Sequence, residues 1–304
     1  MENGQNQEKV HNSEILFIYE AEGCNPNGDP DNGNRPRKDS QGFIEVTDLR
    51  LKRYIRDYME RFGGKNIAIK EGIEADKISD LIKTVIKDIK CDDEKNFLEA
   101  FKDIAYFGIV TGSEGKSNKQ ELGFLKPNYY GAVQFQYGKS YNIGEIESHG
   151  ISPVFTTLGE DHRLTYGVVG FYGVVNGMTA DKNHLTNDDI AKLDEYIING
   201  VAQMSRFSRS KLGQRPLIYA RIEYKDGFAP QNLRKLVSID KTEAIYSTSD
   251  FKFDISKLVE KIKKNIKNIE CVSYFIADDL DVKINIEDEI KVKKLELKSS
   301  GNEQ

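Results

Sequence analysis

Residues 15–38 read ILFIYEAEGCNPNGDPDNGNRPRK, an apolar segment that runs directly into a loop. The first part, Ile15 to Tyr19, has the apolar and aromatic character that is typical of a strand. The second part, Gly23 to Lys38, holds three prolines, three glycines and four asparagines, so we expect no helix or strand ladder to run through it. It ends in three cations, Arg35, Arg37 and Lys38. A turn-rich, cation-tipped loop that leaves a strand suits the recognition of an anion.

The bulk composition is that of a globular protein. With 304 residues, 38% of them hydrophobic, the chain can bury a sizeable core in one large domain or two ordinary ones. No apolar stretch approaches the roughly 20 residues that span a bilayer, and the polar start lacks the apolar core of a signal peptide. We therefore expect a cytoplasmic protein with no membrane partner.

The cysteines and histidines do not predict a cofactor. The three cysteines are far apart in the sequence, with no Cys-x-x-Cys motif and no histidine pair nearby. Neither a disulfide framework nor a zinc site is indicated by such spacing. We interpret them as free thiols and expect no cofactor.

The distribution of charge is more informative than the net charge of −5. Arginine falls mainly into two groups, one between Arg35 and Arg61 and the other between Arg206 and Arg234. The window 199–222 contains no acidic residue and carries Arg206, Arg209, Lys211, Arg215 and Arg221. Because the planar guanidinium binds phosphate oxygens two at a time, we interpret this window as a cationic patch on an acidic protein.

A helix is expected from about residue 48 to 62. Thr47 can cap its start, and Asp48 complements the helix dipole. Apolar side chains recur at spacings of three and four, which marks a buried stripe: Leu51, Tyr54, Ile55, Tyr58 and Phe62. The cations between them are Arg50, Lys52, Arg53 and Arg56. We expect these cations on or beside the exposed side of the helix, where a ligand can reach them.

The rest of the chain mixes strands and helices. Strands are expected at 104–110, 132–137, 151–157, 164–175, 216–224, 235–240 and 271–276, and further helices over 66–100, from Thr186 to about Met204, and over 254–269. The strands expected at 151–157 and 164–175 are joined by a polar turn at 158–163, so they predict a projecting hairpin. This order favours an α+β fold, with an antiparallel sheet and helices on one face, and a ferredoxin-like core is the economical arrangement.

Asp29 and Asp31 leave several interpretations open. Alternating oxygen ligands are typical of EF-hand loops, but the register fails: counted from Asn27, position 6 is Asn32 instead of glycine and position 12 is Lys38 instead of glutamate. The two carboxylates can instead hold a divalent metal for phosphoester cleavage, although the histidines are not spaced as ligands of one another. A structural turn held by Asx hydrogen bonds is the third interpretation.

The segment from Ser205 to Arg215 interleaves cations with hydroxyl groups and one aromatic ring. Hydroxyl and guanidinium groups both bind phosphate oxygens, and Phe207 can stack on a base. An ordinary polar connection after the preceding helix explains the same residues without RNA, and a solvated face is the corresponding alternative for the cations of the helix at 48–62. The run Tyr166 to Val175 lacks the leading cation and the aromatic alternation of an RNA-recognition motif strand, so we expect it to pack in the core.

Three segments together resemble the backbone subunit of type I CRISPR Cascade surveillance complexes, in the RAMP superfamily, and the I-B-like branch fits best. They are NPNGDPD followed by NRPR at 25–31 and 34–37, GAVQFQYGKSYN at 131–142, and SRSKLGQ at 208–214. The segments occur in the order found in the family, and the resemblance spans about residues 12 to 240.

The resemblance implies a particular architecture and an RNA site. It implies a single modified RRM-like palm over 12–300, with a helical insertion at 66–100 as fingers, a loop at 111–128, a thumb hairpin at 146–168, and flexible termini at 1–11 and 298–304. The RNA-binding residues implied are Asn27, Asn34, Arg35, Arg37, Arg50, Lys52, Arg53, Arg56, Gln134, Gln136, Arg206, Ser208, Arg209, Ser210 and Lys211. The thumb residues implied are His149, His162 and Arg163.

By this resemblance the protein is a non-catalytic scaffold that polymerises head to tail along a CRISPR guide RNA (crRNA). The partners implied are the guide RNA, further copies of the chain, other Cascade subunits, target DNA reached through the guide, and a recruited helicase-nuclease. Type III relatives cut RNA with an aspartate in a loop of similar location. A metal-dependent ribonuclease that uses Asp29 or Asp31 therefore stays open as the alternative, as does an interaction module that binds no nucleic acid.

Overall fold

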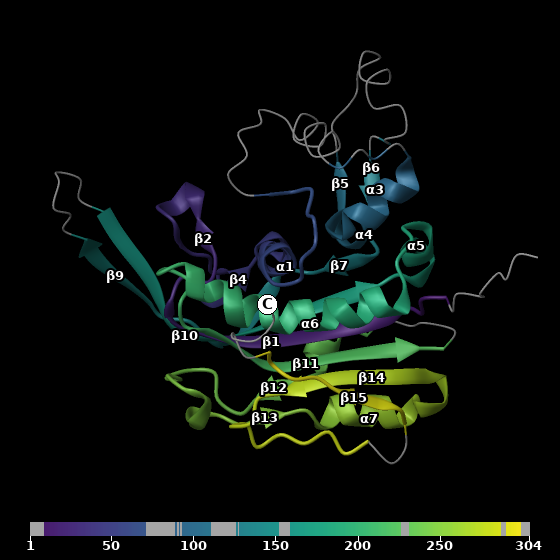
Figure 1. The fold of residues 1–304 in the computed structure, drawn as a ribbon. Helices are drawn as coiled ribbons and strands as arrows, with labels where there is room; N and C mark the ends of the chain where they lie inside the picture. Colours follow the sequence, from purple (N-terminus) through teal and green to yellow (C-terminus); the bar gives the residue numbers. More distant parts are fainter. Residues whose placement is uncertain are drawn as a thin grey trace, which may run out of the picture.

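A large sheet forms the centre of the protein in the computed structural model, which describes residues 9–70, 89, 91, 93–110, 126, 128–151, 159–225, 231–286 and 290–298. Figure 1 shows its long strands stacked between the helices drawn above them and one helix drawn below. The strand order is β15 (Val292–Lys294), β14 (Ile269–Ile276), β11 (Gln214–Tyr224), β1 (Ser13–Cys24), β10 (Gly159–Val175), β8 (Gly138–Ile143) and β4 (Phe43–Val46). Two more strands pair with β10, namely β7 (Val133–Phe135) and β9 (Ile146–Ile151). The mixed α+β fold and its mostly antiparallel sheet were predicted from the sequence.

β1 is the central strand, because it pairs antiparallel with β10 on one side and with β11 on the other. Its residues from Ser13 to Ala21 are all buried. A strand that is covered on both faces carries a continuous apolar run instead of an alternating pattern. This accounts for the unbroken apolar segment from Ile15 to Tyr19.

Two capped helices cover one face of the sheet. α1 (Asp48–Arg61) begins at Thr47, whose Oγ1 accepts a hydrogen bond from the Arg50 N–H at 3.3 Å. α6 (Asn187–Met204) begins with a reciprocal capping box between Thr186 and Asp189. The two helices pack against each other. Both starts were predicted from the sequence.

A third helix lies on the opposite face, which corrects the prediction that the helices share one face. Arg221 of β11 pairs in register with Ile15 and reaches Asp194 of α6, at 2.7 Å. The residue before Ile15 in β1, Glu14, must point to the other face of the sheet because successive strand residues alternate between faces. Glu14 accepts a hydrogen bond from Lys261 of α7 (Ser256–Lys264) at 2.5 Å. The segment after residue 240 thus covers the second face, as Figure 1 shows for α7.

Several predicted elements differ from the structure. The strand expected at 104–110 is helix α4 (Lys102–Phe107), preceded by α3 (Glu94–Ala100) and followed by β5 (Gly108–Val110), which pairs with β6 (Asn128–Tyr130). The buried residues Phe101, Ile104 and Ala105 have helical spacing, so the periodicity was misread. The strand expected at 235–240 is a 3₁₀ turn, η3 (Leu233–Leu236), and a two-residue strand, β12 (Ser238–Ile239), paired with β13 (Phe253–Asp254).

The opening loop contains more regular structure than we predicted. β2 (Gly28–Asp29) pairs with β3 (Arg35–Pro36), and a 3₁₀ turn, η1 (Pro30–Asn32), lies between them. Asn34 and Gly33 both have φ of 59°, the left-handed conformation that asparagine and glycine tolerate best. The asparagines and glycines therefore permit a tight ladder instead of preventing one.

A hairpin is present in the described residues as an antiparallel pair of β9 and β10, from Gly159 opposite Ile151 to Leu164 opposite Ile146. The prediction of a turn at 158–163 is wrong, because residues 159–163 belong to β10 and pair with residues 147–151. It projects from one end of the sheet (Figure 1). Residues 152–158 lie outside the described residues, as do 1–8, 71–88, 90, 92, 111–125, 127 and 299–304. Most of the predicted helical insertion, loop and flexible termini therefore remain predictions. Within the described part, no helix is both long and apolar enough to span a membrane.

Candidate nucleic-acid interface

Three segments that are distant in the sequence meet at one end of the sheet. The Asn25 N–H donates to the Ser210 carbonyl at 2.7 Å, and Lys211 Nζ donates back to the Asn25 carbonyl at 2.7 Å. The Asn27 Oδ1 atom accepts from both the N–H and the hydroxyl of Thr47, at 3.2 and 2.9 Å. We call the surface formed by residues 25–37, 47–61 and 205–214 the basic surface.

The loop is held in shape by its own polar side chains. Asp29 Oδ1 accepts from Arg37 Nη2 at 2.9 Å and from the Asp31 N–H at 3.4 Å. The Asn34 N–H donates to the Asp29 carbonyl at 2.8 Å, and Asn25 Nδ2 donates to the Asn34 carbonyl at 2.6 Å. The Asp29 carboxylate therefore orients Arg37. The described part of the chain shows no cluster of three or more His, Cys, Asp or Glu residues that could hold a metal.

The prediction that the cations of α1 are all presented to a ligand is wrong for Lys52 and Arg56, which are buried. Lys52 pairs with Asp48 at 2.8 Å, and Arg56 pairs with the fully buried Asp103 at 3.1 Å. Arg and Lys stems can cover apolar surface while the head group binds a carboxylate, and that is the arrangement here. The positive charges of both side chains are therefore neutralised by ion pairs within the fold.

Arg53 is also engaged, because it pairs with Asp57 at 2.6 Å and donates to the Ile69 carbonyl at 2.7 Å. Arg50 differs from its neighbours. Its guanidinium carbon lies 4.1 Å from the centroid of the Tyr54 ring, and the Tyr54 hydroxyl accepts a hydrogen bond from Gln214 Nε2 at 2.8 Å. The roles of Tyr54 and Gln214 in supporting Arg50 were not predicted from the sequence. The signal that could have indicated Gln214 is its place at the end of the SRSKLGQ motif.

Arg50 and Lys211 are neighbouring cations without a carboxylate partner in the described part of the chain. Burial, followed by the repulsion from Arg50, lowers the pKa of Lys211 to about 8. Burial raises the pKa of the nearby Cys24 thiol to about 12, so this group supplies no negative charge at neutral pH. Two adjacent cations that are left uncompensated form a site for an anion.

Two of the five cations in the window 199–222 pair with acidic residues from other parts of the fold, so the cationic patch is smaller than we predicted. Arg215 forms a bidentate pair with Asp279, at 2.7 and 2.9 Å, and also binds Glu20 at 2.6 Å. Arg221 is buried against Asp194. These acids come from other parts of the chain, so the window alone could not reveal them. The cations that stay on the basic surface are Arg206, Arg209 and Lys211.

The base of the β9–β10 hairpin lies beside the basic surface. Arg35 is 4.0 Å from Glu160, and Arg209 is 3.8 Å from Asp161, which also pairs with Arg163 at 2.6 Å. Of the two histidines predicted for the thumb, His162 is buried and its Nδ1 lies 2.8 Å from the Ser148 hydroxyl. His149 is exposed and lies 3.2 Å from Glu147. The hairpin thus contacts the predicted RNA-binding residues through acidic side chains.

Comparison with known proteins identifies the family. The family model described as CRISPR-associated protein Cas7 matches residues 11–256. The chain belongs to the Cas7 family. A protein named CRISPR-associated protein Cas7 from Haloferax volcanii is 32% identical over 312 aligned positions, which cover 92% of this chain and 90% of that protein.

A similar fold is found among solved structures. A chain of a structure described as a CRISPR RNA-guided surveillance complex, pre-nicking, aligns with a TM-score of 0.54 and 12% identity, covering 94% of this chain and 96% of that chain. At this identity the match shows the fold alone. It agrees with a mixed α+β chain built on a mostly antiparallel sheet.

Gln134 and Gln136 of this Cas7 chain are not brought to the basic surface. They lie in and just after β7, which pairs with Gly173 to Val175 at the end of β10 away from the hairpin. With about 3.3 Å of rise per residue, that end is roughly 30 Å from Leu164. Gln136 Oε1 instead accepts from Asn232 Nδ2 at 2.9 Å. Sequence spacing gave no indication of this separation.

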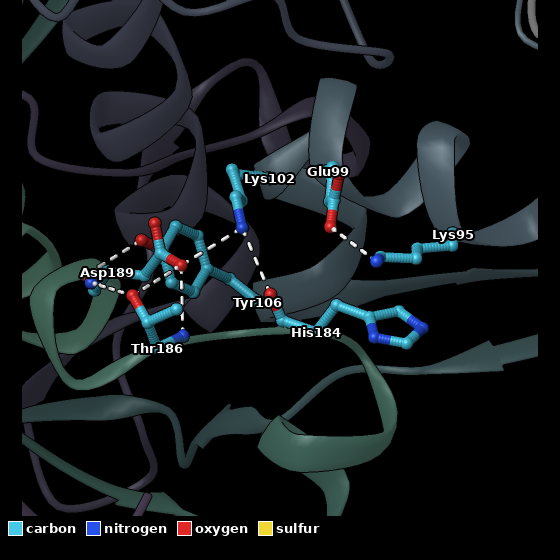
Figure 2. A network of polar contacts seen from close by, with 7 residues as sticks. All are labelled: Lys95, Glu99, Lys102, Tyr106, His184, Thr186 and Asp189. Carbon is cyan, nitrogen blue, oxygen red and sulfur yellow. Dashed lines mark hydrogen bonds and ion pairs between the residues drawn. The ribbon is translucent and has the colours of Figure 1, made fainter. Parts of the chain in front are cut away.

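A second polar network lies at the start of α6, beside α5 (Gly177–Lys182), as Figure 2 shows. Lys102 Nζ donates to Asp189 Oδ2 at 2.9 Å and to the His184 carbonyl at 3.2 Å. Although burial acts to raise it, hydrogen bonds from Thr186 and Lys102 hold the pKa of Asp189 below its ordinary value. A cavity of about 580 Å³ adjoins the network. Because Lys102 and Asp189 neutralise each other, we interpret the network as a structural joint between α4 and α6.

Proposed function

We propose that this Cas7 protein binds the guide RNA of a CRISPR surveillance complex along its basic surface, as a non-catalytic scaffold. The observation that carries the proposal is the pair Arg50 and Lys211, two adjacent cations with no carboxylate partner in the described structure. They lie where a strand-to-loop junction, a helix start and a hydroxyl-rich segment meet. A phosphate of an RNA backbone fits this combination of charge and hydrogen-bond donors.

The relatives support the same assignment. The Haloferax protein carries the name CRISPR-associated protein Cas7, and the solved chain belongs to an RNA-guided surveillance complex. Transferring a place in such a complex to this chain is part of the proposal. Its partners are then the guide RNA, further copies of the chain, other Cascade subunits, target DNA paired to the guide, and a recruited helicase-nuclease.

The proposed organisation is one RRM-like palm over 12–300, with fingers from the insertion at 66–100 and a thumb from the hairpin at 146–168. The strand order β11, β1, β10, β8 supports it, because α1 follows β1 and α6 follows β10. This is the βαββαβ order of a ferredoxin-like core. The thumb carries His149, His162 and Arg163 and extends toward a neighbouring copy.

The proposed RNA contacts are narrower than the set that the sequence implies. We assign backbone contacts to Arg35, Arg37, Arg50, Ser208, Arg209 and Lys211, with Asn27 as a positioning residue for the loop. Asn34 and Ser210 contribute through their carbonyl groups to the shape of the site. Lys52 and Arg56 are assigned to the internal ion pairs instead, and Gln134 and Gln136 to the far end of β10.

The proposal is tested by the RNA that the protein carries. Protein expressed with a CRISPR array should purify with an absorbance ratio at 260 and 280 nm typical of a ribonucleoprotein, and the extracted RNA should have guide sequence. The double variant Arg50→Glu, Lys211→Glu should purify without RNA, and its circular dichroism spectrum should show that it stays folded although the Lys211–Asn25 hydrogen bond is lost. Wild-type protein that carries no RNA and binds none on addition would overturn the proposal.

A further inference from the structure

An aromatic cluster lies at the end of the basic surface farthest from the loop. Phe62 follows α1, and Phe207 ends the 3₁₀ turn η2 (Ser205–Phe207) that follows α6. Their ring centroids are 6.5 Å apart with planes inclined at 52°, and the Phe62 ring also stacks on Tyr58 at 5.2 Å. The cluster joins the ends of the two helices that cover the same face of the sheet.

Both phenylalanine rings are unusually open to solvent. Phe62 is 49% exposed and Phe207 is 60% exposed, whereas Tyr58, on which Phe62 stacks, is 6% exposed. Single exposed apolar side chains are common on protein surfaces and need no explanation. Two adjacent rings, one of which stacks on a buried tyrosine, form a prepared surface instead.

One side of the Phe207 ring is backed by a cation. The guanidinium carbon of Arg61 lies 4.4 Å from the ring centroid, within the distance of a cation–π interaction. A guanidinium stacked on an aromatic ring holds the ring in one orientation. The solvent-exposed part of Phe207 is then available to a second flat group.

The surroundings of Phe207 favour a nucleic-acid base as that group. Phe207 directly precedes Ser208 and Arg209, and the window 199–222 contains no acidic residue. Arg50 and Arg61 belong to the same helix, and with 1.5 Å of rise per residue they are about 16 Å apart along its axis. A single-stranded RNA that contacts Arg50 and Lys211 can therefore continue along α1 to the aromatic cluster. Aromatic rings beside a cationic track are the usual way to bind single strands.

We infer that Phe207, backed by Arg61, stacks on one unpaired base of the bound RNA. The inference rests on the proposed RNA-binding function and adds a contact to a base where that proposal involves only the backbone. Because every base has a π-face, the contact is independent of sequence. It fixes the position of one nucleotide relative to the phosphates held at the other end of α1.

The absence of tryptophan from the chain allows a direct test. Phe207→Trp introduces a single tryptophan, which can be excited at a wavelength that the 15 tyrosines do not absorb and whose emission a stacked base quenches. Titration with a single-stranded RNA should quench it strongly, and an abasic ribose-phosphate strand of equal length should bind without quenching. The matched control is Met178→Trp in α5, at a side chain that is 70% exposed, near the opposite end of α6; it should show no quenching with either strand.

Affinity measurements give a second readout. Phe207→Ala should weaken RNA binding about 5- to 100-fold, from the usual contribution of one base–aromatic stack, and Phe207→Tyr should restore it. The salt dependence of binding should not change, since no phosphate contact is lost. Unchanged affinity of Phe207→Ala together with an unquenched Phe207→Trp would overturn the stacking and leave the proposed function intact. RNA binding absent from the wild-type protein would overturn both.

A Phe207→Ala variant that keeps its RNA affinity but loses association with a protein partner would also overturn the stacking. That result would assign the cluster to a protein interface instead.

Discussion

Lys211 loses its proton closer to neutral pH than an ordinary lysine does, because burial and Arg50 lower its pKa to about 8. Only the protonated amine attracts a phosphate. RNA affinity should therefore be highest below pH 8 and fall as the pH rises through that value in the free protein. A bound phosphate favours the charged form, so the midpoint in the complex should be higher.

Fluorescence anisotropy with a labelled single strand between pH 6.5 and 9.5 measures this dependence. Lys211→Arg should bind at all these values without the decline, since an arginine stays protonated. The matched variant Lys211→Met should bind weakly and without a transition near pH 8. If wild type and Lys211→Met decline together, another group is responsible and the assignment of Lys211 is wrong.

Asp29 should act on the shape of the loop and not on chemistry, because its carboxylate binds Arg37 and the Asp31 N–H. Asp29→Ala should weaken RNA binding about two- to fivefold, in line with a partly exposed ion pair. It should leave the length of a complementary RNA unchanged after incubation with magnesium. Denaturing electrophoresis decides this: cleavage by the wild type that Asp29→Ala abolishes would establish the ribonuclease alternative.

At the scale of elements, the Lys102–Asp189 joint should stabilise the protein without affecting RNA. Lys102→Met leaves the Asp189 carboxylate without its cation and should lower the free energy of unfolding by about 1–3 kcal/mol. RNA affinity should not change. The matched control is Lys95→Met, since Lys95 and Glu99 form an exposed pair at 3.8 Å that should contribute little. Both positions are visible in Figure 2.

The same joint predicts a pH effect on stability. The pKa of Asp189 is held below the ordinary 3.8, so its stabilising contribution is complete above that value and is lost as the pH falls through the lower folded-state pKa. Urea denaturation at several acidic pH values should show the difference between wild type and Lys102→Met shrinking as Asp189 is protonated. A constant difference down to pH 2 would exclude Asp189 as the partner.

The elements also show what local sequence can predict. Thr47 and Thr186 mark helix starts through nearby residues, and both were located correctly. The burial of Arg56 depends on Asp103, 47 positions away, and the position of α7 depends on Lys261 reaching Glu14, 247 positions away. Such pairings are fixed by the sheet topology, which the spacing of apolar residues does not encode.

The candidate site was likewise predictable only where nearby residues in the sequence carry the signal. The motifs at 25–37 and 208–214 pointed to one surface because their residue types suit phosphate, and the structure brings them together. The separation of Gln134 from that surface follows from the length of β10 and its pairing with β7 at the far end. No feature of the sequence near residue 134 carries that information.

For the whole molecule, the proposed head-to-tail assembly predicts a filament whose length is set by the RNA. In the proposed assembly, the thumb hairpin of one copy would contact a different surface of the next copy, and such an interface is heterologous and does not close. Light scattering should show monomers without RNA and particles whose mass grows in proportion to RNA length. A fixed oligomer that ignores RNA length would contradict head-to-tail assembly.

The salt dependence of RNA binding is the sharpest test of whether Arg50 and Lys211 hold a phosphate. For a single strand, the slope of log K against log salt is about −0.7 per phosphate neutralised. We predict that the double variant Arg50→Ala, Lys211→Met has a slope about 0.7 units shallower than wild type, since the two cations share one phosphate, whereas Lys267→Ala in the C-terminal segment keeps the wild-type slope. A double variant with the wild-type slope would contradict the account, since the two cations would then contact no phosphate.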